Sequence, residues 1–172
     1  MDEIINNQIL NKDDESYVRY SEASRSAAVD EQSFSTFKRN PNYTYELEHT
    51  SPELGNHYIT LLLEEYKEDL KKINWDDIRI NDKYGGTSVY PFQQLEPFCG
   101  KHFTFSPTTV GYLYLALRMV NSLKNKNVKD VDVFEIGCGY GGQCFLFNTV
   151  ANFLEVSVNS YNLVLISTIK NK

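Results

Sequence analysis

The sequence predicts an α/β fold in which a helical N-terminal region leads into a β-loop-α-β unit. Two segments, 52–73 and 107–123, carry apolar residues at helical spacing, and each begins with a Ser-Pro pair. A short apolar run at 131–136 is followed at once by a cluster of glycines and then by another helical stripe. The last apolar segment, 156–169, contains many β-branched residues, which favour a second strand.

Residues 1–105 are predicted as a mainly helical N-terminal region. A helix is expected at about 15–29, where the periodicity is weak. The next helix begins with Ser51 as its N-cap and Pro52 at its first position. Its apolar stripe consists of Leu54, Tyr58, Leu61, Leu62, Leu70 and Ile73. Residues 80–105 are rich in glycine and proline, so we expect a long irregular connection there.

A second region, 106–172, is predicted to begin an α/β domain. Ser106 and Pro107 repeat the helix-start pattern, and the helix is expected to continue to about Leu123. The nearly continuous apolar run that follows is typical of a parallel strand that is covered on both faces. A length of 172 residues suits one domain, or a small domain with an appended helical segment.

The charge and composition of the chain argue against some classes of binding partner. The net charge is −6 and the isoelectric point is about 5.1, which argues against a nucleic-acid surface. No apolar run approaches the ~20 residues that span a bilayer, so no membrane insertion is expected. The N-terminus, MDEIINNQIL, lacks the pattern of a signal peptide, and the three cysteines form no C-x-x-C pair. We therefore expect a cytoplasmic protein that binds small molecules or other proteins, and a homo-oligomer is left open.

The glycine cluster is the strongest functional signal in the chain. The segment 131–144 reads VDVFEIGCGYGGQC. A strand, a glycine turn and a helix place backbone N–H groups and a helix N-terminus at the carboxyl end of a parallel strand, where cofactors bind. Gly137, Gly139 and Gly142 fit the dinucleotide pattern G-x-G-x-x-G. Glu135 with Gly137, Gly139 and Gly141 also fits E-x-G-x-G-x-G, the first motif of S-adenosylmethionine-dependent methyltransferases.

Glu135 favours the methyl donor over the dinucleotide. A carboxylate gains nothing from a pyrophosphate, whereas S-adenosylmethionine carries an ammonium and a sulfonium that a carboxylate complements. The structural alternative is a glycine turn that only lets the helix and the strand pack closely. The residues predicted to bind the cofactor are Glu135, Gly137, Cys138, Gly139, Tyr140 and Gly141.

Four segments together resemble the sugar O-methyltransferase family of bacterial S-adenosylmethionine-dependent enzymes. EIGCGYGGQC at 135–144 is similar to that family's form of the first motif, and FSPTTVGYLY at 105–114 is similar to its S-P-T-T helix start. YELEHTSPELGNHYI at 45–59 and NDKYGG at 81–86 resemble its upstream region. The resemblance implies a Rossmann-like domain, S-adenosylmethionine as cofactor, a sugar or glycan as substrate, and methyl transfer to a sugar hydroxyl in polysaccharide biosynthesis.

The chain departs from the family in two places. Gly111 stands where the family pattern S-P-T-T-x-R-Y has an arginine. No Asp or Glu follows Glu155, although the ribose hydroxyls need an acidic residue about 20 residues past the glycines. Asn159 could replace that residue only if the second strand covers 156–158. The expectation from the sequence is a truncated or frame-shifted member that binds the cofactor weakly or not at all and does not turn over.

The remaining candidates carry less weight. By resemblance, His49 could bind or deprotonate a sugar hydroxyl, and it is the only candidate catalytic residue. Four aromatic residues of the 80–105 connection could stack on a sugar ring or fill the core: Tyr84, Tyr90, Phe92 and Phe98. No metal site is expected, because His102 and the cysteines match no zinc spacing. The other functions left open are a dinucleotide-binding protein of the NAD(P) type, a non-enzymatic interaction module and a truncated translation product.

Overall fold

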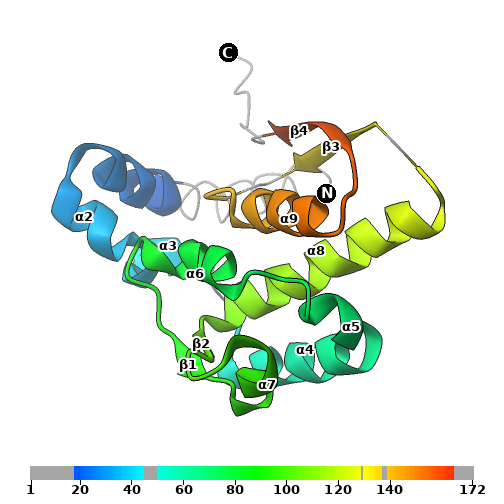
Figure 1. The fold of residues 1–172 in the computed structure, drawn as a ribbon. Coiled ribbons are helices and arrows are strands. Elements are labelled where there is room, and N and C mark those ends of the chain that lie inside the picture. The colour runs from blue at the N-terminus through cyan, green and yellow to red at the C-terminus, as the bar shows by residue number, and fades with distance from the viewer. Residues whose placement is uncertain (1–17, 45–49, 129, 137–138, 165–172) are drawn as a thin grey trace, which may run out of the picture. The chain divides into compact units, whose positions relative to one another are not determined.

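The computed structural model describes residues 18–44, 50–128, 130–136 and 139–164 (Figure 1). These residues form two compact units. The first unit comprises the described residues of Met1–His49 together with Lys83–Ser88, and the second comprises Thr50–Asp82 with Val89–Lys172 as far as it is described. The expected boundary at 105/106 falls inside the second unit.

The first unit is helical. Residues 18–29 form a helix, in agreement with the expected 15–29, and α2 (Glu31–Thr36), η1 (Phe37–Arg39) and α3 (Pro41–Thr44) follow. Asp30 caps α2 by accepting the Ser33 N–H at 2.6 Å. The Lys38 N–H donates to the Gly85 carbonyl at 2.9 Å, which ties the glycine turn at 85–86 to the helices of this unit.

In the second unit, the helix expected at 52–73 is two helices. The first, α4 (Pro52–Glu65), ends at Tyr66, whose backbone (φ −130°, ψ 19°) leaves the helical region; the second is α5 (Lys67–Leu70). The prediction of one continuous helix is therefore wrong. The interruption redirects the chain so that Leu70 and Ile73 enter the same core as Trp75, the first residue of α6 (Trp75–Lys83).

The connection expected to be irregular at 80–105 contains regular structure. β1 (Tyr90–Pro91) pairs antiparallel with β2 (Thr104–Phe105), and η2 (Gln93–Leu95) and α7 (Glu96–Cys99) lie between them. Glycine and proline mark turns but do not show which side chains are buried. Phe92, Leu95 and Phe105 are fully buried and fix this segment on the core.

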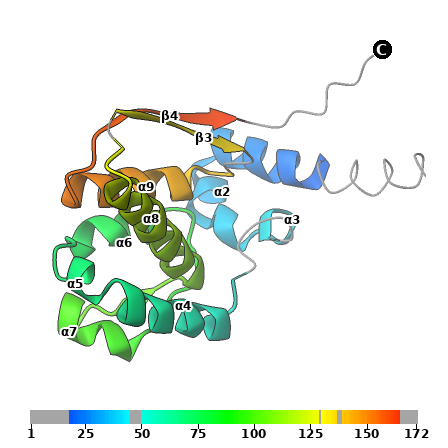
Figure 2. The ribbon, with the colours of Figure 1, turned by 90° about the vertical axis from the view of Figure 1, so that its right-hand side faces the viewer.

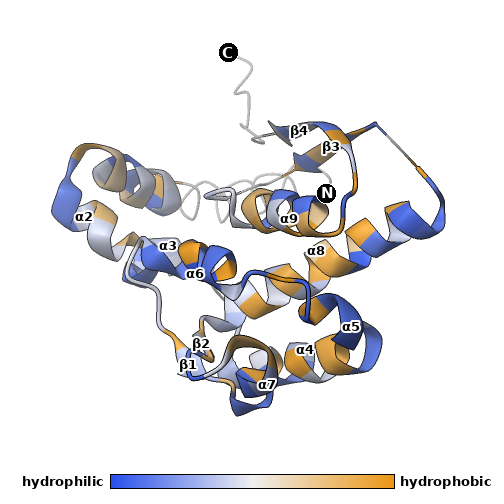
Figure 3. Cartoon of the chain, viewed as in Figure 1, coloured by the Kyte–Doolittle hydropathy of each residue, from blue (hydrophilic) through white to orange (hydrophobic). Residues whose placement is uncertain are grey.

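Helix α8 (Pro107–Asn125) is the centre of the second unit. It packs against α4 on one side and α9 (Gly142–Phe153) on the other (Figures 1 and 2). Figure 3 shows hydrophobic residues along α4, α8 and α9, whereas α5 and the C-terminal end of α8 are mainly hydrophilic. Gly111 lies at the contact between α4 and α8, where an added Cβ would stand 3.0 Å from the Tyr58 ring. An arginine at this position, as in the S-P-T-T-x-R-Y pattern, would fit only if the Tyr58 ring moved.

The two-stranded sheet of β3 (Val131–Ile136) and β4 (Val158–Val164) is parallel, with α9 as the connection. The predicted strand-turn-helix-strand order is thus confirmed, and the structure is mixed α/β. The expectation that the first strand is covered on both faces is wrong. Val133 packs against the core, but Phe134 and Ile136 on the opposite face are each 68% exposed.

Within the described ranges, no helix has both the length and the apolar character needed to cross a membrane.

Both predicted Ser-Pro helix starts are confirmed. The Ser51 hydroxyl accepts the Leu54 N–H at 3.2 Å, and the Ser106 hydroxyl accepts the Thr109 N–H at 3.0 Å. Each Ser→Ala substitution should therefore lower the free energy of unfolding, by about 0.5–2 kcal/mol. Ser106→Ala should cost more, because Ser106 is buried and Ser51 is exposed. Urea denaturation of both variants measures this, and equal unfolding midpoints for both variants and the parent chain would refute it.

Candidate functional site: the glycine turn

The glycine turn joins the carboxyl end of β3 to the N-terminus of α9. Gly137 and Cys138 lie outside the described residues, whereas Gly139, Tyr140 and Gly141 form the described part of the turn. Gly141 is the N-cap of α9 and has φ +84°, a left-handed conformation that favours glycine. An added Cβ at Gly142 would stand 2.6 Å from the Tyr140 ring. Local geometry therefore explains two glycines of the motif. Gly141 adopts a left-handed backbone conformation, and a side chain at Gly142 would collide with the Tyr140 ring.

Glu135 is the penultimate residue of β3, as predicted. Its side chain is half-buried, and its Oε2 accepts a hydrogen bond from the Tyr161 hydroxyl of β4 at 2.9 Å. The Tyr161 ring packs edge-on against Phe147 of α9, with 5.2 Å between ring centroids. These contacts hold the carboxylate between the sheet and the helix. A carboxylate offers about four acceptor sites, so it retains capacity for a ligand cation after this one bond.

Tyr140 connects the glycine turn to residues far away in the sequence. Its hydroxyl accepts the side-chain N–H of Asn81 at 3.1 Å, and the same Asn81 nitrogen donates to Thr109 Oγ1 at 2.6 Å. Asp82 accepts the Thr109 hydroxyl at 2.6 Å and the Ser106 backbone N–H at 2.8 Å. We call Asn81, Asp82, Ser106, Thr109 and Tyr140 the polar cluster.

The polar cluster joins three segments that carry the family resemblance. Asn81 and Asp82 come from the NDKYGG segment, Ser106 and Thr109 from the S-P-T-T helix start, and Tyr140 from the glycine motif. Asn81, Ser106 and Thr109 are buried. Sequence reasoning did not select Asn81, Asp82 or Thr109 as site residues. The sequence feature that could have indicated these residues is their position inside NDKYGG and FSPTTVGYLY, two segments already identified by their resemblance.

Gln143, in the first turn of α9, is a further residue that the sequence did not single out. Its side-chain N–H donates to the Tyr112 carbonyl at 3.3 Å. Its Oε1 is buried, and none of the described residues donates a hydrogen bond to it. A buried acceptor without a donor costs about 1–3 kcal/mol, so a ligand donor at this position would be favourable.

The structure does not bring every sequence-based candidate to the turn. His49 lies outside the described residues. Asn159 is the second residue of β4 and donates to the Asp130 carbonyl at 2.8 Å, so it is at the amino end of the strand and not at the carboxyl end that a ribose site requires. Because β4 covers Val158–Val164 and not 156–158, Asn159 does not take the place of the missing ribose carboxylate. Phe92 is buried in the core and is excluded as a sugar-stacking residue.

No metal centre emerges from the part of the chain that the structure describes. It contains no group of three or more His, Cys, Asp or Glu side chains arranged to hold a metal ion.

Comparison with known proteins gave no neighbour: no family model, no curated protein and no solved structure matches this chain.

Proposed function

We propose that the chain is related in function to S-adenosylmethionine-dependent O-methyltransferases and that its glycine turn binds the methionine end of the methyl donor. The observation that carries the proposal is the position of Glu135 beside a glycine turn that opens a helix after a parallel strand. The partial positive charge of the α9 N-terminus suits the donor's carboxylate. Glu135 suits its ammonium and sulfonium.

Two further features of the turn support this assignment. The Oε1 of Gln143, which accepts no hydrogen bond from the described residues, is an acceptor in the first turn of the same helix, where an ammonium or hydroxyl donor of the ligand would satisfy it. The hydrogen bond from Asn81 to Tyr140 ties the turn to α6. Pre-formed sites of this kind bind with less ordering cost than flexible loops.

The acceptor in this proposal is a sugar hydroxyl, and the support for it is the resemblance of the three segments that meet at the polar cluster. The reaction is an in-line displacement, in which the hydroxyl oxygen attacks the methyl carbon and the sulfur leaves as a thioether. The protein contributes orientation of the two reactants and a base for the hydroxyl proton. We assign no base, because His49, the only catalytic candidate from the sequence, lies outside the described residues.

The second candidate function is dinucleotide binding, since the same turn also satisfies G-x-G-x-x-G. The two ligands differ in their need for Glu135. A pyrophosphate is repelled by this carboxylate, whereas the methyl donor is attracted to it.

The test is a titration followed by the amide NMR signals of the glycine turn. We expect S-adenosylmethionine to shift the signals of Gly139 and Gly141, and Glu135→Gln to weaken the binding by about tenfold, through loss of a charge-assisted contact. Asp132→Asn is the matched control. It removes a carboxylate from the same strand, but from a side chain that is exposed and accepts the Ser160 hydroxyl, so binding should not change.

Two results would refute the proposal. One is the absence of any shift in the turn at millimolar S-adenosylmethionine. The other is a response to NAD that is stronger than the response to S-adenosylmethionine and grows in Glu135→Gln, which would assign the turn to a dinucleotide.

A further inference from the structure

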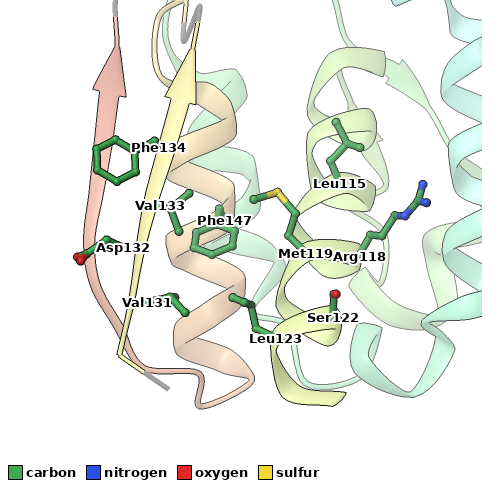
Figure 4. A pocket seen from close by; sticks show the side chains of 10 residues that line it. All are labelled: Leu115, Arg118, Met119, Ser122, Leu123, Val131, Asp132, Val133, Phe134 and Phe147. Atoms are coloured by element: carbon green, nitrogen blue, oxygen red, sulfur yellow. The ribbon is translucent and has the colours of Figure 1, made fainter. Parts of the chain in front are cut away.

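An apolar pocket of about 620 Å³ lies beside the first half of β3, away from the glycine turn. Its walls are Val131 and Val133 of β3, Leu115, Met119 and Leu123 of α8, and Phe147 of α9, with Arg118, Ser122, Asp132 and Phe134 at its borders. Figure 4 shows Val131 and Val133 on the helix side of the strand, facing Phe147 and Met119. None of Glu135, Tyr140 or the described glycines lines it.

The strand beside the pocket has an open edge. Among the described residues, β3 pairs with β4 and with no other strand. The backbone N–H and C=O groups along the other edge of β3 therefore have no ladder partner within the described chain. Such an edge is a template for another strand.

The helix beside the pocket is also incompletely covered. Leu115 and Met119, one turn apart on α8, are 40% and 37% exposed, and Leu123 continues their stripe by another turn. These side chains lie where the apolar side chains of a neighbouring strand would pack. An apolar stripe and an unpaired strand edge thus border the same pocket.

We propose that this pocket is a docking site for an extended peptide strand, which pairs with β3 at its open edge and places alternate apolar side chains against α8. Strand addition satisfies both features at once, because main-chain hydrogen bonds pair the edge while every second side chain enters the pocket. A small apolar molecule would fill the pocket and leave the edge unpaired. A second copy of this chain is disfavoured, because each copy carries a net charge of −6.

The probe is a synthetic peptide of about eight residues in which valine alternates with threonine, with lysine at both ends for solubility. We expect it to bind the chain, measured by fluorescence anisotropy, and to slow hydrogen exchange at alternate amides of β3. A peptide of the same sequence, N-methylated at alternate residues on its pairing edge, should bind at least about tenfold more weakly, because it cannot donate to β3.

Leu115→Glu should weaken binding of the unmodified peptide by about tenfold or more, since it places a charge against the docked side chains. Leu54→Glu is the matched control, because Leu54 on α4 is 41% exposed and does not line the pocket, so the affinity should not change. Met119→Glu repeats the test at a second partly exposed position, and circular dichroism verifies that each variant is folded.

Three results would overturn the proposal. The first is no binding of the unmodified peptide at millimolar concentration. The second is binding that neither N-methylation nor the α8 variants weaken. The third is concentration-dependent self-association of the parent chain that Leu115→Glu abolishes, which would show that the occupant is a second copy.

Discussion

Asp82→Ala should lower the free energy of unfolding by about 3–5 kcal/mol. Asp82 accepts the Thr109 hydroxyl at 2.6 Å and the Ser106 backbone N–H at 2.8 Å, and both donor residues are buried. Hydrogen bonds to a charged group contribute about 1.5–3 kcal/mol each, and the substitution leaves two donors without this acceptor. The helix start of α8 and the support of the glycine turn should weaken together, because Thr109 also accepts the Asn81 amide.

Urea denaturation followed by circular dichroism measures this effect. Asp76→Ala is the matched control, since Asp76 lies in the same helix, is 86% exposed and pairs with Arg79 at the surface. Surface ion pairs contribute about 0–1 kcal/mol, so the control should unfold close to the parent chain. If the Asp82 and Asp76 variants lose equal stability, the polar cluster does not hold the fold as we infer.

S-adenosylmethionine should bind this chain with a dissociation constant on the order of 1 mM. The glycine turn and Glu135 supply contacts for the methionine end, but the chain has no Asp or Glu after Glu155 and therefore none at the end of β4 for the ribose hydroxyls. Each charge-assisted hydrogen bond of that kind contributes about 1.5–3 kcal/mol. Losing them weakens binding by about tenfold to a few hundredfold relative to a site that has the carboxylate.

Isothermal titration calorimetry with S-adenosylmethionine tests this affinity. The parallel titration with S-adenosylhomocysteine is the control for the sulfonium, because the thioether lacks the positive charge that Glu135 complements. Micromolar binding of the methyl donor would contradict the prediction and would show that residues of β4, or residues after it, contact the ribose without a carboxylate.

Local sequence patterns determined the elements around the candidate site. Ser51 and Ser106 were identified as N-caps because a short polar side chain before proline can satisfy a free N–H of the first turn, whatever the rest of the fold. The strand, glycine turn and helix over 131–153 followed from the apolar run and the glycines. Such features depend on residues within one or two turns of each other, so sequence spacing is enough to find them.

Only the tertiary structure decided which residues meet and which faces are buried. The break at Tyr66, the antiparallel pairing of β1 with β2 and the exposed face of Phe134 depend on what packs against each segment. An apolar pattern does not identify that packing partner. The hydrogen bond of Asn81 to Tyr140 spans 59 residues and has no local signal. Long-range contacts of this kind depend on chain topology, which is why the sequence identified the glycine turn but not the polar cluster that supports it.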